Sequence, residues 1–270
     1  MTEAGAFMRA IIDRPDDDSP RLIYADWLEE NGETERAEFI RLQCARSSAR
    51  TQTSVRPEAV LREMDLLEHY QAQWTPRIAQ LAKSLQASFN RGFIEHVLVE
   101  ARAFVAGADQ LFAQSPVRSV QLIWGAEPPY ERARFMQTIA AVPHLARIVA
   151  LNLTDGFIGS DGAQALAVSE YLGKLEVLRL GGGHIGERGV RALVQAPWFG
   201  NLTHLNLANN DVNAGAVHAL AVGLETLKAA GRLRLKRIDL AGNPLRTAGF
   251  RVIRGSPVLR RLAHMSESVE

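Results

Sequence analysis

Three segments in the second half of the chain place their leucines at the same spacing, with polar or small residues between them. They read "IVALNL", "LEVLRL" and "LTHLNL", and each follows the form L-x-x-L-x-L, with isoleucine at the first position of one copy. Their final leucines are Leu153, Leu180 and Leu207, so both intervals are 27 residues. Because alternate side chains of a strand point to opposite faces, each segment predicts a short strand whose leucines face a core.

A turn and a helix follow each of these predicted strands. A glycine or asparagine comes three residues after the final leucine, at Gly156, Gly183 and Asn210, and helical patterns such as "GVRALVQAPWF" come next. Looser copies of the strand end at Val99, Leu122 and Leu240. A strand of this kind cannot bury its leucines alone, but stacked copies form a parallel sheet backed by helices. We therefore expect an α/β solenoid over residues 91–262, with about six repeats, a concave sheet and convex helices.

This arrangement resembles the leucine-rich repeat proteins, and the 27-residue unit with a full helix resembles their ribonuclease-inhibitor-like subclass. The resemblance covers residues 93 to about 262. It implies a turn asparagine after each strand, but only Asn210 and Asn243 supply one, because glycine stands at positions 156 and 183. We therefore expect an incomplete ladder of side-chain amides along the turns and a less regular first half of the solenoid.

The first ninety residues lack the repeat and show helical periodicity instead, which predicts an all-helical module over residues 1–90. The expected helices lie near residues 3–12, 20–30, 35–46 and 57–87. Ser19 and Pro20 predict the N-cap and first turn of the second helix, and Gly32 predicts its end. At 100° per residue, the acidic side chains of this helix occupy one strip, so we expect its other sides to be buried.

Residues 6–43 resemble the bacterial repeat-companion domain, a short helical module that precedes leucine-rich or other repeats. The segments that carry the resemblance are "PDDDSPRLIYADWLEE" and "RAEFIRLQ". The resemblance implies no biochemical activity. It implies an N-terminal cap that shields the exposed edge of the first repeat.

The acidic residues of this module raise the question of a metal or catalytic site. The cluster comprises Asp16 to Asp18, Asp26, Glu29 and Glu30. A calcium loop that starts at Asp18 would place Pro20 and Leu22 at its third and fifth positions, and neither can supply a side-chain ligand. The aspartates also precede a helix, whose N-terminus favours anions. We expect a structural role, with a metal-dependent hydrolase that uses Asp16 to Asp18, Asp26 and Glu29 as the alternative.

Little else in the sequence indicates chemistry. Cys44 is the only cysteine, which excludes an internal disulfide and points to a buried thiol in a reducing cytoplasm. The seven histidines form no H-x-x-x-H pair, and we expect no metal and no cofactor. The chain has 11 basic and 15 acidic residues up to position 90, and 20 and 15 after it. This asymmetry is too mild to predict nucleic-acid binding, and no apolar run predicts a membrane span.

The solvent-facing positions of the predicted strands offer the better functional candidates. Residues between the inward leucines must point to the concave face, which places Arg179, Asn206, Arg237 and Asp239 together. The segment "WGAEPPYERARF" contains Pro128 and Pro129, which we expect to prevent helix and strand and to force a protruding loop. Tryptophan, tyrosine and arginine often anchor interfaces. The candidate partner-binding residues are Trp124, Tyr130, Arg132, Asn152, Arg179, His204, Asn206, Arg237 and Asp239.

We therefore expect a non-catalytic recognition or scaffold protein that binds a protein partner through the concave face. The C-terminal segment predicts a truncated last strand and a polar tail over residues 263–270. A regulator of an enzyme such as a small GTPase is the second interpretation, because some relatives of the repeat subclass act in this way. The partner and the oligomeric state are left open by the sequence.

Overall fold

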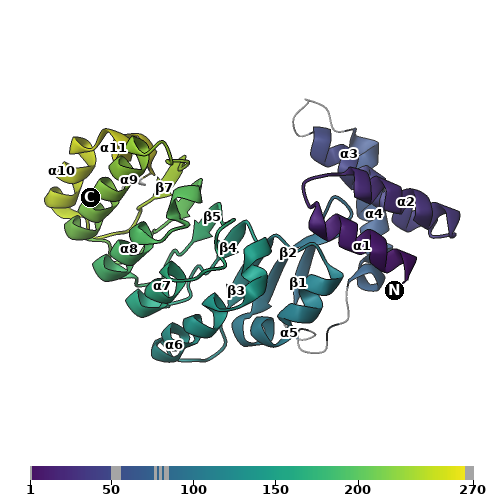
Figure 1. The fold of residues 1–270 in the computed structure, drawn as a ribbon, viewed down its shortest axis with the longest axis horizontal. Coiled ribbons are helices and arrows are strands. Elements are labelled where there is room, and N and C mark those ends of the chain that lie inside the picture. The colour runs from purple at the N-terminus through teal and green to yellow at the C-terminus, as the bar shows by residue number, and fades with distance from the viewer. Residues whose placement is uncertain (1, 50–55, 76–77, 79–80, 82–84, 265–270) are drawn as a thin grey trace. The chain divides into compact units, whose positions relative to one another are not determined.

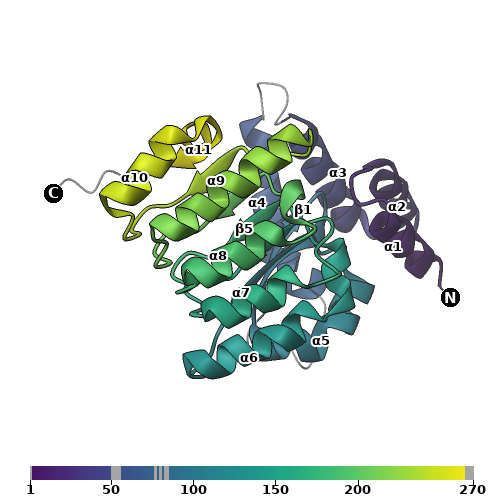
Figure 2. The same cartoon turned by 60° about the vertical axis from the view of Figure 1, so that its left-hand side comes forward.

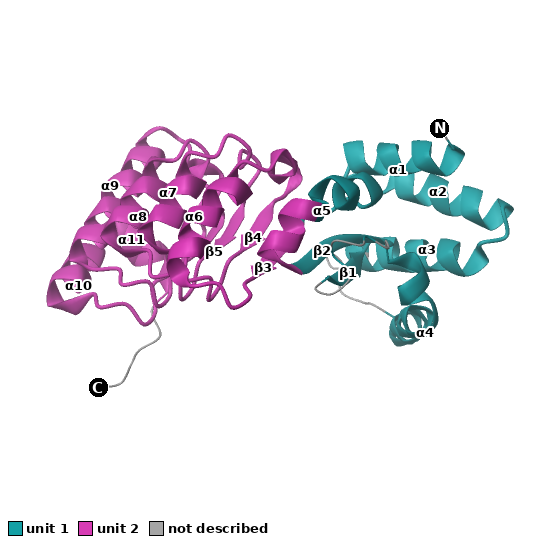
Figure 3. Ribbon diagram, turned by 90° about the horizontal axis from the view of Figure 1, so that it is seen from below, with its two compact units in different colours: residues 1–98, 107–118 teal, residues 99–106, 119–270 magenta. Residues whose placement is uncertain are grey.

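The computed structural model describes residues 2–49, 56–75, 78, 81 and 85–264, and Figure 1 shows its helices and strands. The chain divides into two compact units, which Figure 3 colours separately. The first unit comprises residues 1–98 and 107–118, and the second comprises residues 99–106 and 119–270. The strand order is the order along the chain, from β1 to β8.

The first unit contains four helices and a strand pair within its described residues. The elements are α1 (Glu3–Asp13), α2 (Ser19–Glu30), α3 (Thr34–Ala49), α4 (Pro57–Trp74), β1 (Gln86–Asn90) and β2 (Phe93–Glu100), followed by α5 (Ala101–Gln114), which is shared by the two units. The core of the first three helices includes Ile11, Leu28, Ile40 and Cys44, with Phe93 from β2 packed among them. The apolar side chains of α1, α2 and α3 therefore meet in a common centre to which β2 also contributes.

The segment before β2 is a strand where the periodicity predicted a helix to residue 87. Helix α4 ends at Trp74, and β1 pairs with β2 in antiparallel register from Gln86 opposite Leu98 to Asn90 opposite Phe93. Arg91 and Gly92 form the turn, with φ of 50° and 85°. Two positive φ values match the twist of a tight hairpin, so this turn and its pairing override the helical pattern. Residues 76–77, 79–80 and 82–84 of the expected helix lie outside the described residues.

Two further details of the first unit correct the sequence predictions. Ser19 is the first residue of α2, Asp18 is its N-cap, and the side chain of Asp17 accepts the hydrogen bond from the Ser19 amide at 2.9 Å. The helix thus begins one residue earlier than expected. Helix α2 is also less buried than predicted, because Leu22 is 39 % and Ile23 56 % exposed. Gly32, with φ of 85°, follows the C-cap Asn31 as expected.

The second unit repeats a strand and a helix, with the helices on one side of the sheet (Figures 1 and 2). The strands are β3 (Ser119–Ile123), β4 (Ala150–Asn152), β5 (Val177–Arg179), β6 (His204–Asn206), β7 (Arg237–Asp239) and β8 (Ala263–His264). The helices are α6 (Pro129–Ala140), α7 (Gly159–Ala167), α8 (Gly186–Gln195), α9 (Ala214–Ala229), α10 (Arg246–Gly255) and α11 (Pro257–Leu262), with short 3-10 turns at Pro143–Arg147 and Phe199–Asn201. This alternation is consistent with a solenoid.

The 27-residue spacing becomes the register of the parallel sheet. Leu151, Leu178 and Leu205 lie opposite one another on successive strands, and all three are buried. The next leucines of the pattern, Leu180 and Leu207, are also buried. Each strand therefore contributes the same inward side chains at the same height, which closes one continuous apolar core. The truncated last strand is also present, as β8 pairs with β7 in parallel.

The prediction that Pro128 and Pro129 prevent helix formation is wrong. Pro129 is the first residue of α6, and Pro128 is its N-cap in extended conformation. Proline fits the first helical turn because the amide it lacks has no partner there, and its fixed φ suits the helix. The connection between β3 and α6 is therefore residues 124–128, and Tyr130 and Arg132 lie on the helix.

The turn asparagines form hydrogen bonds in two directions. The Asn210 side chain accepts from the amides of Gly183 and Ile185 and donates to the carbonyls of Leu180 and Ala208. Asn243 repeats this pattern in the turn after the next strand, β7. Its side chain accepts from the amides of Asn210 and Val212 and donates to the carbonyls of Leu207 and Leu240. These bonds satisfy backbone groups that the short strands leave unpaired.

The ladder stops where the sequence has glycine, as predicted. At Gly183 an added Cβ would lie 2.8 Å from the Leu180 carbonyl and 2.9 Å from the Asn210 Oδ1, so the glycine admits the neighbouring amide. The strand register nevertheless continues unbroken from β3 to β7. The expected irregularity of the first half is therefore absent from the strand pairing.

Asn210→Ala should lower the free energy of unfolding by about 3 kcal/mol, because four backbone groups lose a buried partner. Urea denaturation followed by circular dichroism measures the effect. Asn213→Ala is the matched control, since it removes one N-cap bond of α9 to the Ala216 amide and should cost about 1 kcal/mol. Equal losses in the two variants would show that the ladder adds nothing beyond an ordinary cap.

Candidate functional site

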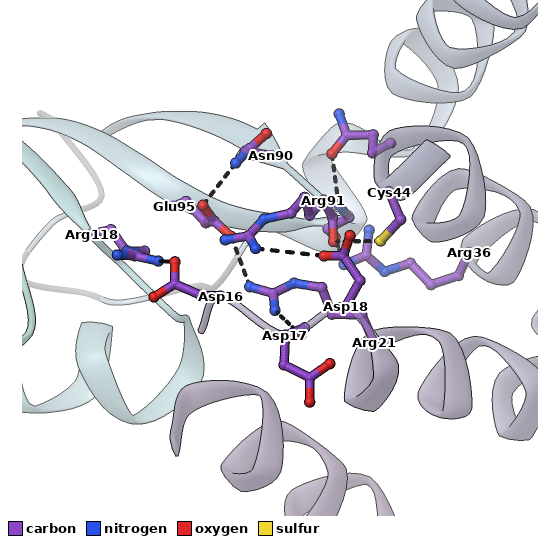
Figure 4. Close-up of polar contacts among 12 residues, drawn as sticks. Asp16, Asp17, Asp18, Arg21, Arg36, Cys44, Asn90, Arg91, Glu95 and Arg118 are labelled. Atoms are coloured by element: carbon purple, nitrogen blue, oxygen red, sulfur yellow. Dashed lines mark hydrogen bonds and ion pairs between the residues drawn. The ribbon is translucent and has the colours of Figure 1, made fainter. Parts of the chain in front are cut away.

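The acidic residues of the first unit face arginines that come from distant parts of the chain (Figure 4). Arg21 is fully buried, and its Nη2 lies 2.8 Å from Oε1 of Glu95. The Nη2 of Arg91 lies 2.8 Å from the same carboxylate oxygen, and Asn90 donates to Oε2. Two buried guanidinium groups therefore share one carboxylate. A buried charge of this kind is tolerated only when it is paired and hydrogen-bonded.

The three aspartates of "DDDSP" each have a structural partner. Asp16 pairs with Arg118, Asp17 accepts from the Ser19 amide, and Asp18 lies 3.5 Å from Arg91. The hydrogen bond from Arg118 lowers the pKa of Asp16 below its usual value, and the bond from the Ser19 amide does the same for the pKa of Asp17. Both groups thus stabilise the folded state above an ordinary aspartate pKa and lose that contribution as the pH falls through the lowered values.

The helix carboxylates are also engaged. A single guanidinium nitrogen of Arg41 lies 2.7 Å from both Asp26 and Glu29. Within the described part of the chain, no group of three or more His, Cys, Asp or Glu side chains is placed to hold a metal ion. Arginines lie beside Asp16, Asp18, Asp26 and Glu29 of the acidic cluster.

Arg36, which is half-buried, is surrounded by aromatic rings. The guanidinium carbon of Arg36 lies 4.7 Å from the ring centre of Trp74, 5.3 Å from Phe93 and 5.5 Å from Phe39. Its Nη2 donates to the Gly92 carbonyl, and burial lowers its pKa to about 10. Arg36 forms no ion pair with the described residues, and cation–π contacts with these rings stabilise its charge instead. The contacts join α3, α4 and the hairpin of β1 and β2.

Cys44 is buried beside this network, as the sequence predicted. Its Sγ lies 3.8 Å from the Arg91 carbonyl, and burial raises the pKa of the thiol to about 12. The thiolate is the reactive form, so this cysteine is suited to packing and not to nucleophilic chemistry.

The sheet of the second unit presents two rows of side chains on the face opposite its helices. One row contains Ser119, Ala150, Val177, His204 and Arg237, and the next contains Gln121, Asn152, Arg179, Asn206 and Asp239. The strand register therefore brings together the six candidates that the sequence assigned to this face.

Three of those six candidates have local roles in the turn that follows their strand. The side-chain oxygens of Asn152, Asn206 and Asp239 each accept a hydrogen bond from the backbone amide two residues later, at 2.9 to 3.0 Å. This is the usual turn-forming geometry of Asn and Asp. Arg179 and Arg237 are exposed, and their guanidinium groups form no hydrogen bond or ion pair with the residues that the structure describes. These two cations are the groups on the face left free for a partner.

A second surface, which we call the edge row, consists of Phe157, His184 and Asp211 on the loops after β4, β5 and β6, with Arg132 of α6 beside Phe157. The Arg132 guanidinium lies 5.9 Å from the Phe157 ring centre, and the Phe157 ring stacks on His184 at 5.3 Å. Nδ1 of His184 lies 2.7 Å from Oδ2 of Asp211. Phe157, His184 and Asp211 are 27 residues apart, so they hold one repeat position on successive loops at one edge of the sheet.

The edge row has an unusual backbone conformation. Phe157, His184 and Asp211 have φ of 49°, 52° and 56°, in the left-handed region that bulky residues rarely adopt. Phe157 is also 39 % exposed. An exposed aromatic ring held in a strained conformation is a feature of functional surfaces. The sequence analysis missed this row, although the 27-residue spacing of the three positions was a signal that could have found it.

The candidates from the predicted loop differ in accessibility. Trp124 is half-buried, lies edge-on against Phe135 and faces the Arg132 guanidinium at 5.8 Å. Arg132 donates to the backbone carbonyls of Glu127, Gly125 and Gly156, so it holds the loop in place. Tyr130 is 72 % exposed. Of these candidates, Tyr130 offers the freest side chain.

Comparison with known proteins gives one family match. Residues 201–221 match the family model described as Leucine Rich repeat, and they span the end of one repeat, β6 and the first half of α9. This match and the alternation of parallel strands and helices fit a leucine-rich repeat protein. Repeats of this type suggest protein–protein interaction in general and are usually non-catalytic. No curated protein matches the chain. None of the described helices has the length and apolar character needed to cross a membrane.

Glu95→Leu should lower the free energy of unfolding of the first unit by about 3 to 5 kcal/mol, because it leaves two buried arginines without their carboxylate. The rate of Cys44 modification by a thiol reagent in increasing urea reports on this unit, since Cys44 is the only cysteine and is buried. Glu29→Gln, which breaks the exposed ion pair with Arg41, should change the free energy of unfolding by less than about 1 kcal/mol. Equal sensitivity of the two variants would contradict a central role for the buried network.

Proposed function

We propose that the protein is a non-catalytic recognition protein that binds a protein partner through the open face of its sheet and the edge row. The observation that carries the proposal is the pair of exposed arginines, Arg179 and Arg237, which lie in neighbouring rows of the sheet face without an acidic partner among the described residues. Arginine forms bidentate hydrogen bonds with carboxylates and is enriched at the centres of interfaces.

The edge row supports the same proposal. Phe157 is 39 % exposed, and Tyr130, which lies on α6 outside the edge row, is 72 % exposed. His184 and Asp211 continue this surface with polar groups. A rim of polar groups around aromatic anchors is the usual anatomy of a protein interface. The sheet face would supply charge and the edge row would supply apolar contact area.

We also propose two finer family assignments. The 27-residue unit with a full helix supports the ribonuclease-inhibitor-like subclass. The segments "PDDDSPRLIYADWLEE" and "RAEFIRLQ" support a repeat-companion domain at the N-terminus. The engagement of Asp16, Asp18, Asp26 and Glu29 by arginines gives no support to the alternative of a hydrolase built on these carboxylates.

Reversing the two sheet-face charges in Arg179→Glu, Arg237→Glu should abolish capture of a partner from cell lysate, as measured by affinity isolation and mass spectrometry. Stability should change by less than about 0.5 kcal/mol, because both side chains are exposed. The matched control is Arg188→Glu, Arg191→Glu on α8, which changes net charge equally at another exposed place. Capture of the same proteins by wild type and both variants would refute the proposed face.

Phe157→Gly should reduce partner capture while leaving the free energy of unfolding within about 1 kcal/mol of the wild type. Glycine adopts the left-handed φ of 49° without strain, which offsets the lost contacts of the ring with Arg132 and His184. The binding and unfolding experiments are done on the same preparation. Unchanged capture would remove the edge row from the binding surface, and a large loss of stability would assign Phe157 to packing.

A further inference from the structure

The basic residues of the second unit are concentrated at its C-terminal end. Residues 91–227 contain 10 basic and 12 acidic residues, whereas residues 228–264 contain 10 basic residues and a single acidic one, Asp239. The overall value of +1 for the chain and the mild excess after residue 90 therefore conceal a local charge of +9. Such a concentration of one sign destabilises the folded state through repulsion, and it attracts partners of opposite charge.

Three of the earlier arginines of this unit form ion pairs, whereas none of the described C-terminal ones does. Arg102 pairs with Glu127, Arg188 with Asp161, and Arg191 with Glu187. None of the ten basic residues in 228–264 takes part in an ion pair with the described residues, and all ten are exposed. The fold therefore leaves these charges open to an external partner.

Six of the ten lie on three helices that pack against one another at this end of the unit (Figure 2). This surface, which we call the basic end, consists of Lys228 on α9, Arg246, Arg251 and Arg254 on α10, and Arg260 and Arg261 on α11. Lys228, Arg254, Arg260 and Arg261 stand in the last turns of their helices, where the helix dipole favours cations. That effect does not account for Arg246 in the first turn or Arg251 in the middle of α10.

We propose that the basic end binds an acidic segment of the protein partner. This inference rests on the proposed function, because it identifies the chemistry of that partner. Carboxylates complement the one-signed charge of the basic end and its arginines can hold them by bidentate hydrogen bonds. Phe250 on α10 is 43 % exposed and lies one turn from both Arg246 and Arg254, so it offers an apolar contact within the charged surface.

Two observations favour a polypeptide over a nucleic acid. Arg237 belongs to the same basic segment but lies on the sheet face, where Asp239 stands two residues away in the neighbouring row. A phosphate backbone laid across this face would meet the Asp239 carboxylate, whereas a polypeptide can present its own amide groups there. The family match over residues 201–221 also lies just N-terminal to this segment, in a type of repeat that suggests protein binding.

The test uses the full-length protein and a fluorescent peptide of about 16 residues that repeats Glu-Glu-Leu-Glu, long enough to span the basic end when extended. Binding is measured by anisotropy at about 0.15 M salt, where distant charges are screened. The comparison probes are the same peptide with glutamine for every glutamate, single-stranded and duplex DNA of similar charge, and vesicles containing phosphatidylserine. We expect the acidic peptide to bind more tightly than every other probe.

The variants locate the site. Arg251→Glu, Arg254→Glu should weaken binding of the acidic peptide by at least about tenfold, while Arg188→Glu, Arg191→Glu changes it less than about twofold. If circular dichroism shows that the Arg251→Glu, Arg254→Glu variant does not fold, the variant Arg260→Glu, Arg261→Glu on α11 is used in its place. An equal loss in the α8 control, tighter binding of DNA or vesicles, or no binding of the peptide would each overturn the proposal. Loss of lysate capture only in Arg179→Glu, Arg237→Glu would retain the proposed function and reject the basic end.

Discussion

The second unit depends on one constraint, that no single strand of three residues can bury its own leucines. Each strand must therefore stack in register on its neighbours, and the 27-residue spacing of β4, β5 and β6 places Leu151, Leu178 and Leu205 in one buried row. The same register fixes everything on the opposite face, because successive residues of a strand alternate sides. Core and candidate surface are thus two consequences of one packing requirement.

In the turns, side-chain amides form hydrogen bonds with backbone groups that such short strands leave unpaired. The Asn210 side chain forms four such bonds and the Asn243 side chain five, whereas Gly183 leaves room for the amide of its neighbour. In the turns with glycine in place of asparagine, the strand register is maintained without side-chain amide bonds from that position. The residue that follows this glycine or asparagine has a left-handed φ in three of the turns, at Phe157, His184 and Asp211. The conformation of the turn thus creates an exposed row of side chains.

The first unit is organised by charge as well as by apolar packing. Arg21 and Arg91 converge on Glu95, and Arg36 lies among aromatic rings without a carboxylate. Both arrangements place a desolvated cation where only a specific set of neighbours stabilises it, which makes the geometry specific at some cost in stability. The acidic run that suggests a site in the sequence is one component of this arrangement, since its carboxylates face arginines. By contrast, the cations of the last repeats have no such neighbours and remain available to a partner.

The sequence by itself determined the repeat, the inward leucines, the sheet-face rows and the places where the asparagine ladder breaks. These features follow from a fixed period and from the alternation of side chains along a strand, which are local properties. Only the tertiary structure decided that residues 86–90 form a strand, that Pro129 begins a helix, and that Arg21 faces Glu95, 74 residues away. The hairpin, the buried ion pairs and the cation–π contacts depend on groups that are distant in the chain. Their energies arise from burial and mutual proximity, which no local pattern of residues specifies.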